Sequence, residues 1–238
     1  MVSTRSSSTA IATPRAQKSE SATPPPSTIP KTRASRASNS SVWSHAPSTL
    51  TLVWLGVTLP LVIYDTTYVL LRPLTMEGGS LHWPLFVPYE MYGDVDHVYG
   101  WPAFERHDGF TGAQSFMNVV ETAMYLVYLG LWYRNAKPAK TAGARSAVDG
   151  PVGALALLIG FSAAVMTFSK TALYWLNEYY SGYSNVGHNS IQRVIFVFVL
   201  LNGPWLIGPA ILTYRLGSEI VAGLASASAP PARRGKSE

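Results

Sequence analysis

Polar and ionisable side chains interrupt apolar stretches of this 238-residue chain at positions that could do chemistry. Gln114, Asn118, Glu121 and Tyr125 recur at steps of four and three residues, which predicts that they share one face of a helix. Asp65 interrupts another apolar stretch. Ionisable groups in hydrocarbon cost about 3 kcal/mol or more, so they face a bundle interior or a watered cavity. Two carboxylates beside one cavity would suit proton transfer.

Two further apolar stretches carry more candidates, among them a lysine, an amide and two large aromatic side chains. We predict the catalytic residues to be Asp65, Glu121, Asn202 and Trp205, and the ligand-binding residues to be Tyr68, Gln114, Asn118, Tyr125, Lys170 and Tyr174. Structural roles stay open for several of them. The amides could only join helices by hydrogen bonds, Lys170 could neutralise a buried carboxylate, and the aromatic side chains could be core.

No metal site and no cofactor is expected. The chain has no cysteine, which excludes a disulfide framework, a thiolate nucleophile and cysteine-ligated metal. The five histidines are scattered, and His188 is expected to cap a helix or pack in a loop.

The stretches that position these residues are long enough to cross a membrane. With 47% hydrophobic and 13% charged residues, the chain is too apolar for an ordinary soluble fold. A span needs about 20 mostly apolar residues, and four stretches meet that length: residues 49–71, 113–133, 152–175 and 194–214. The predicted fold class is an all-α membrane protein, a four-helix transmembrane bundle.

Composition divides the chain into three parts. Residues 1–48 form a basic tail rich in Ser, Thr, Pro and Ala that is expected to be disordered, with a transit peptide as the alternative. Residues 49–224 form the membrane domain, and residues 225–238 form a second basic tail. Basic residues between 134 and 145 predict a cytoplasmic loop, and therefore two cytosolic termini. The loop between the first two spans is acidic and aromatic, and is expected to cap the bundle.

The partners expected from this organisation are the lipid bilayer and, in the cavity, a sterol or a related lipid. The net charge of +5 does not indicate nucleic acid, because the basic residues flank the predicted spans. A homodimer is an open alternative to a monomer.

The polar positions also carry a family resemblance over residues 49–224. The motifs are Tyr64-Asp65-Thr66-Thr67-Tyr68, Gln114 with Asn118-Val119-Val120-Glu121-Thr122, Thr171-Ala172-Leu173-Tyr174-Trp175 with Glu178, Gly187-His188, and Asn202-Gly203-Pro204-Trp205 with Pro209. In these motifs the chain resembles the emopamil-binding protein family, the EXPERA membrane domain, in a fungal-type branch.

The resemblance implies a four-helix fold in the endoplasmic reticulum and a cavity that a sterol enters from the lipid. The best known family enzyme is a cholestenol delta-isomerase, which moves a sterol double bond from C8 to C7. By position, Asp65 and Glu121 match its acidic pair, while Asn202 and Trp205 match its amide and its aromatic partner, which faces the carbocation.

The function that we predict is therefore that of a sterol-handling membrane protein, most concretely an isomerase of this kind. Two departures from the isomerase pattern weaken the enzymatic interpretation. Leu61 stands where the isomerase has a histidine, and Lys170 stands where it has a small residue. An ammonium near a carboxylate keeps it ionised, so it cannot donate a proton. The alternative is a binding protein or chaperone for a sterol, lipid or amine, similar to the sigma-two receptor.

Overall fold

The computed structural model describes residues 43–138 and 145–228. Most of the predicted N-terminal tail, part of the predicted cytoplasmic loop and most of the C-terminal tail therefore lie outside the described residues. Within the described ranges the chain is mostly helical, which agrees with an all-α membrane protein. Its β-structure there consists of two strands of two residues each, β1 (Ser44–His45) and β2 (Val148–Asp149), and an isolated bridge between Lys137 and Ala147.

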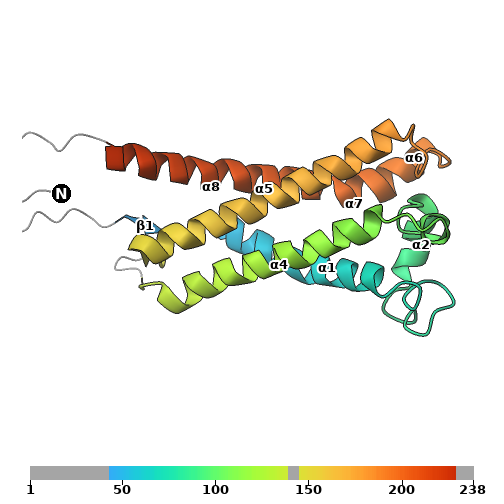
Figure 1. Ribbon diagram of the computed structural model, residues 1–238, viewed down its shortest axis with the longest axis horizontal. Coiled ribbons are helices and arrows are strands. Elements are labelled where there is room, and N and C mark those ends of the chain that lie inside the picture. The colour runs from blue at the N-terminus through green and yellow to red at the C-terminus, as the bar shows by residue number, and fades with distance from the viewer. Residues whose placement is uncertain (1–42, 139–144, 229–238) are drawn as a thin grey trace, which may run out of the picture. The chain divides into compact units, whose positions relative to one another are not determined.

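Four long helical segments lie side by side, each running back along the one before (Figure 1). They are α1 (Thr49–Leu70), α4 (Phe110–Asn135), α5 (Gly150–Tyr180) and a C-terminal run of α6 (Ile191–Arg193), the π-helical turn η1 (Val194–Val199), α7 (Leu200–Asn202) and α8 (Pro204–Ser228). Helix α1 packs on α4, α4 on α5, and α5 on α8. Buried side chains such as Leu55, Tyr128 and Ala163 fill the space between the first three.

Three segments of the described chain are long and apolar enough to cross a membrane: Thr49–Leu70, Gly150–Tyr180 and Ile191–Ser228. Many of their large apolar side chains are exposed, as lipid-facing residues are. The chain is therefore an integral membrane protein. The expectation of four spans is confirmed for these three only. Helix α4 is long enough at 26 residues, but Gln114, Asn118 and Glu121 lower its apolar character.

The C-terminal helical run extends beyond the predicted span at residues 194–214 at both ends. The prolines do not end it: Pro209 lies inside α8, and Gly203 before Pro204 keeps helical dihedral angles (φ −58°, ψ −43°). Exposed apolar side chains, including Val221 and Leu224, continue along α8 beyond residue 214. The lipid-facing surface of this segment is therefore longer than the sequence pattern indicated.

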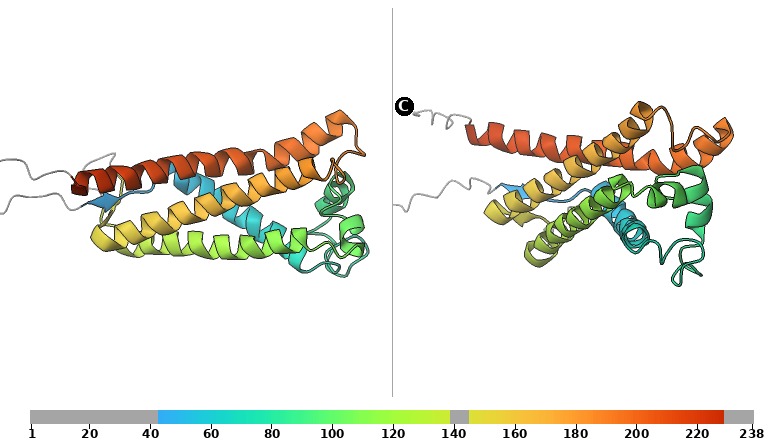
Figure 2. Two further views of the ribbon diagram at one scale, coloured as in Figure 1. Left: turned by 45° about the horizontal axis from the view of Figure 1, so that its top comes forward. Right: turned by 45° about the vertical axis from the view of Figure 1, so that its right-hand side comes forward.

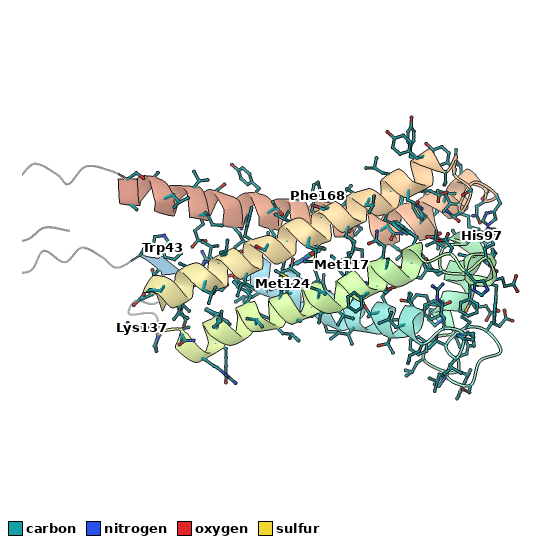
Figure 3. All side chains as sticks on the ribbon, viewed as in Figure 1. Trp43, His97, Met117, Met124, Lys137 and Phe168 are labelled. Carbon is teal, nitrogen blue, oxygen red and sulfur yellow. The ribbon has the colours of Figure 1, made fainter. Side chains whose placement is uncertain are left out.

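Residues 43–48, here named the strap, are ordered although the sequence placed them in the tail. Strand β1 pairs with β2 in an antiparallel register, His45 opposite Val148. The His45 ring is fully buried, with Nδ1 2.8 Å from Glu219 Oε1 and Nε2 3.0 Å from the Tyr128 hydroxyl. The strap therefore joins α4, α5 and α8 at one end of the bundle, and Trp43 and Lys137 lie at that end (Figure 3).

Residues 71–109, here named the cap, cover the opposite end and contain α2 (Pro88–Val95) and α3 (Trp101–Glu105) (Figure 2). The Arg72 Nη1 group and the Thr111 hydroxyl both donate to the Val98 carbonyl, at 3.2 and 2.7 Å. Val95 and Val98 are buried. The acidic, aromatic loop thus packs as a structured cap, as expected, and it closes over the ends of α1, α4 and α5.

Candidate ligand-binding cavity

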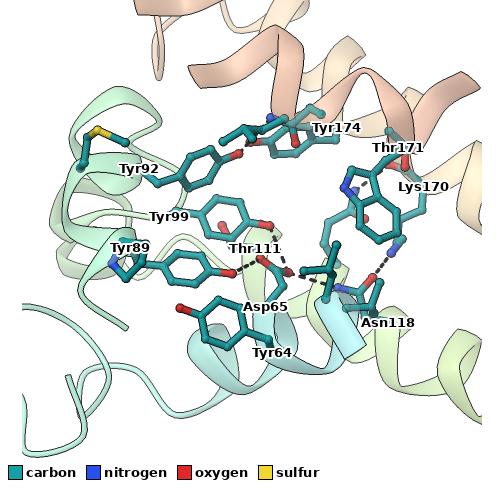
Figure 4. Close-up of a pocket in the computed structure, with 18 residues that line it drawn as sticks. Tyr64, Asp65, Tyr89, Tyr92, Tyr99, Thr111, Asn118, Lys170, Thr171 and Tyr174 are labelled. Atoms are coloured by element: carbon teal, nitrogen blue, oxygen red, sulfur yellow. Dashed lines mark hydrogen bonds between the residues drawn. The ribbon is translucent and has the colours of Figure 1, made fainter. Parts of the chain in front are cut away.

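A cavity of about 410 Å³ lies under the cap, between α1, α4, α5 and the C-terminal run. This volume lies within the range of about 300–1,000 Å³ that holds small-molecule ligands. The lining combines aromatic and apolar side chains with a few polar ones (Figure 4). The lining residues are Leu61, Val62, Tyr64, Asp65, Pro88, Tyr89, Met91, Tyr92, Tyr99, Thr111, Gln114, Asn118, Lys170, Thr171, Tyr174, Leu201, Asn202 and Trp205.

Asp65 is the carboxylate of the cavity, and each of its hydrogen-bond partners is a donor. The Tyr89 hydroxyl donates to Oδ1 at 2.8 Å, while the Tyr99 hydroxyl and the Asn118 amide donate to Oδ2 at 3.3 and 3.4 Å (Figure 4). An ionised carboxyl accepts about four hydrogen bonds. Three are made here, so one acceptor position is left for a ligand.

Behind Asn118 the polar side chains continue to the second predicted acid. The Lys170 ammonium donates to Asn118 Oδ1 and lies 3.1 Å from Glu121 Oε2, a distance that makes an ion pair although the geometry is not that of a hydrogen bond. The Thr167 hydroxyl donates to Glu121 Oε1. Only 3% of the Glu121 side chain and 15% of the Lys170 side chain are exposed. Glu121 is thus neutralised in the bundle interior and does not line the cavity.

Tyrosines of the cap form the roof of the cavity. Burial is the main cause that raises the pKa of Tyr89, Tyr92 and Tyr99, and nearby carboxylates raise it further. These hydroxyls therefore stay protonated and can donate hydrogen bonds. Tyr92 in turn accepts a hydrogen bond of 2.9 Å from the Asn202 amide.

A third acid, Asp96, lies behind the wall of the cavity. It is fully buried and accepts hydrogen bonds from the Tyr174 hydroxyl, which lines the cavity, and from the Val98 amide. Burial, with a smaller effect of Glu178, raises the pKa of Asp96 to about 8. The sequence offered no sign of this, because Asp96 stands among other acids of a polar loop.

The cavity brings together seven of the ten residues predicted from the sequence. These are Asp65, Gln114, Asn118, Lys170, Tyr174, Asn202 and Trp205. Glu121, Tyr68 and Tyr125 lie outside its lining. The Tyr68 ring is stacked under Tyr89 at 3.8 Å, and Tyr125 is buried with its hydroxyl 3.2 Å from Thr167 Oγ1.

Sequence reasoning missed the cap tyrosines Tyr89, Tyr92 and Tyr99 as lining residues. They lie in the loop that was expected to cap the bundle, and none of its residues was named as a candidate for the site. Their signal was the density of tyrosine among acidic residues, which is unusual for a solvated loop. Two of them make the shortest and the next shortest hydrogen bonds to Asp65, so they define its surroundings more than the predicted residues do.

The rim of the cavity is apolar and exposed. Leu61, Met91 and Leu201 line it, and between 51% and 55% of each is exposed. Leu61 and Leu201 belong to segments that can span the membrane. The cavity thus has a polar interior and an apolar opening on the side of the molecule that faces lipid.

Within the described ranges, no cluster of three His, Asp or Glu residues could hold a metal ion. The fold and the cavity define an integral membrane protein with a carboxylate-containing pocket under a cap at one end of its helices. Comparison with family models, with curated proteins and with solved structures gives no match.

Proposed function

We propose that this protein binds a sterol, or a related amphipathic lipid or amine, in the cavity under the cap. The observation that carries the proposal is Asp65, which has one free acceptor position inside a cavity with an exposed apolar rim. The hydroxyl or ammonium group of the ligand donates to Asp65. Its apolar body lies along Leu61, Met91 and Leu201 and reaches the bilayer.

Isomerase chemistry at the same site is the second candidate. It is favoured by the cavity lining, which contains Asp65, Asn202 and Trp205. The resemblance to the emopamil-binding protein family assigns these three residues to the reaction. Two observations favour binding without turnover. Tyr89, Tyr99 and Asn118 occupy three acceptor positions of Asp65, and Glu121 is paired with Lys170 outside the cavity, so the two acids of the reaction do not face one cavity.

The proposal includes α4 as a fourth span, with both termini cytosolic and the protein in the endoplasmic reticulum. The burial pattern of α4 supports the fourth span: polar residues such as Asn118 and Glu121 are buried, while Phe116, Val119 and Val120 are exposed. The location and the orientation rest on the family resemblance and on the basic residues between 134 and 145. A helix with its polar side chains turned inward can cross a bilayer at lower cost than its composition suggests.

The test is binding and turnover in one preparation of the full chain in nanodiscs. Labelled delta-8 sterol and a cationic amphiphilic amine are titrated against the wild type, Asp65→Asn and the matched control Asp94→Asn, which removes an exposed cap carboxylate outside the cavity. A charged hydrogen bond is worth about 1.5–3 kcal/mol, so Asp65→Asn should weaken amine binding by about 10- to 100-fold. The control should bind as the wild type does.

Equal amine affinity of the wild type and Asp65→Asn would refute the role of Asp65. Failure of the wild type to bind either ligand would refute the function as a whole. Conversion of the sterol to its delta-7 isomer by the wild type, lost in Asp65→Asn, would replace the binding proposal by the enzymatic one.

A further inference from the structure

Part of the cap folds back along the last turns of α1. The Tyr64 hydroxyl donates to the Leu85 carbonyl, and the Tyr64 ring stacks on Phe86 at 5.2 Å. One turn further along α1, the Tyr68 ring stacks on Tyr89 at 3.8 Å. Residues 85–89 therefore lie beside residues 64–68 of α1 and not beyond the end of that helix.

This position corresponds to a depth within the membrane. Tyr64 precedes the end of α1 at Leu70 by six residues, or about 9 Å along the helix axis. Helix α1 has 22 residues, about 33 Å, which matches a hydrocarbon core of about 30 Å. With α1 centred in the bilayer, the fold-back would lie at the level where the end of α1 passes from hydrocarbon into headgroups.

The outer side of the fold-back is apolar and exposed. Its large apolar side chains include a tryptophan that is 79% exposed and a leucine that is 66% exposed. The exposed apolar residues of this segment are Leu81, Trp83, Leu85, Val87 and Met91. Two of the side chains between them, His82 and Phe86, turn inward and are buried. On the neighbouring part of α1, Leu61 is also exposed, and it lines the same cavity as Met91, so the two apolar surfaces meet at the rim of the cavity.

We propose that residues 81–91 are an interfacial segment that dips into the same membrane leaflet as the end of α1, with lipid as its partner. Interfacial segments insert about 5–10 Å into the boundary between headgroups and acyl chains, which matches the depth of Tyr64. Much of the backbone is satisfied internally, as the membrane requires. The amides of Phe86 and Tyr89 donate to the carbonyls of His82 and Phe86 at 2.8 and 2.9 Å.

Charge within the segment fits this depth. Glu90 is its one acidic residue, and its side chain is 49% exposed and lies 3.9 Å from His82 Nε2. A side chain at the boundary can place its charged end among the headgroups while its apolar part stays below them. The same segment borders the cavity through Pro88, Tyr89 and Met91, so the lipid-facing surface continues into the rim of the cavity.

The test uses the fact that the chain has no cysteine, so one introduced thiol can carry a nitroxide label at a chosen position. The full chain with Trp83→Cys or Leu85→Cys is labelled in nanodiscs, and collision rates with oxygen and with a water-soluble nickel chelate are compared. Val57→Cys, on the exposed face of α1, gives the lipid reference. Glu105→Cys, on an exposed part of the cap, gives the water reference.

The expected result is a ratio of oxygen to nickel collisions at Trp83 and Leu85 several-fold above that of Glu105 and close to that of Val57. Nickel access equal to that of Glu105 at both positions would overturn the proposal. Spin–spin broadening that grows with the protein-to-lipid ratio would also overturn it and assign the surface to a second copy of the chain. Val87→Cys replaces either position if a label there lowers the Tm.

Discussion

The buried pair of Lys170 and Glu121 offers the sharpest test of how the bundle is held together. At 3.1 Å and an effective dielectric constant of about 20, two unit charges attract each other by about 5 kcal/mol, most of which offsets their desolvation. Removing one partner leaves the other charge in the interior without compensation. We therefore expect Lys170→Met and Glu121→Gln each to lower the free energy of unfolding by about 3–5 kcal/mol.

The double variant should lose far less free energy of unfolding than the sum of the losses in the two single variants, because it leaves no unpaired charge in the interior. A double-mutant cycle in one detergent, with unfolding followed by tryptophan fluorescence, measures this difference. Ser169→Ala is the matched control: its hydroxyl is exposed and bonds only to the Val165 carbonyl of its own helix, so its unfolding should not change. Additive losses in the double variant would refute the pairing of Lys170 with Glu121.

Two further perturbations test the packing and the cap. A Cβ atom at Gly208 would lie 2.2 Å from the Trp54 ring, so Gly208→Ala should lower the free energy of unfolding by about 1–3 kcal/mol and lower the Tm. A Cβ atom at Gly56 would have no atom within 4 Å, so Gly56→Ala is the control and should not lower the Tm. Equal Tm values for the two variants would contradict the contact between α8 and α1. The pKa of Asp96 is about 8 in the folded protein and about 4 in the unfolded chain, so the folded protein holds a proton that the unfolded chain has lost between these pH values. The Tm should therefore fall as pH rises from about 4 to about 8, and Asp96→Asn should make this fall smaller. The same pH profile of the Tm in the variant and the wild type would contradict the raised pKa.

The sequence predicted the helices well where lipid imposes a simple rule. Helix α1 was expected over residues 49–71 and spans Thr49–Leu70, because a long apolar run has no other way to satisfy its backbone in a membrane. The prediction that the polar face of α4 points inward is also confirmed, since Asn118, Glu121 and Tyr125 are all buried. The strap was missed because strands of two residues have no detectable period.

Helical periodicity predicted which side chains of α4 point into the bundle, but not how far along the helix the cavity extends. Gln114, Asn118, Glu121 and Tyr125 share a face of α4, yet only the first two line the cavity. Glu121 lies about 10 Å along the helix from Gln114, and Tyr125 about 16 Å, further from the cap that closes the cavity. Where a cavity ends depends on the fold of the cap and on the conformation of Lys170, which are contacts between segments far apart in the sequence.

The strap has a consequence for the order of events during synthesis. His45 leaves the ribosome before α1, but its partners Tyr128, Val148 and Glu219 lie on α4, β2 and α8, and the last of them is close to the end of the described chain. The pairing with Val148 and the contact with Tyr128 can form once α4 and β2 exist, but the contact with Glu219 has to wait until α8 has been made and inserted. A nascent or truncated chain without α8 would lack this contact, so the Nδ1 side of the His45 ring is the last part of the strap to be covered.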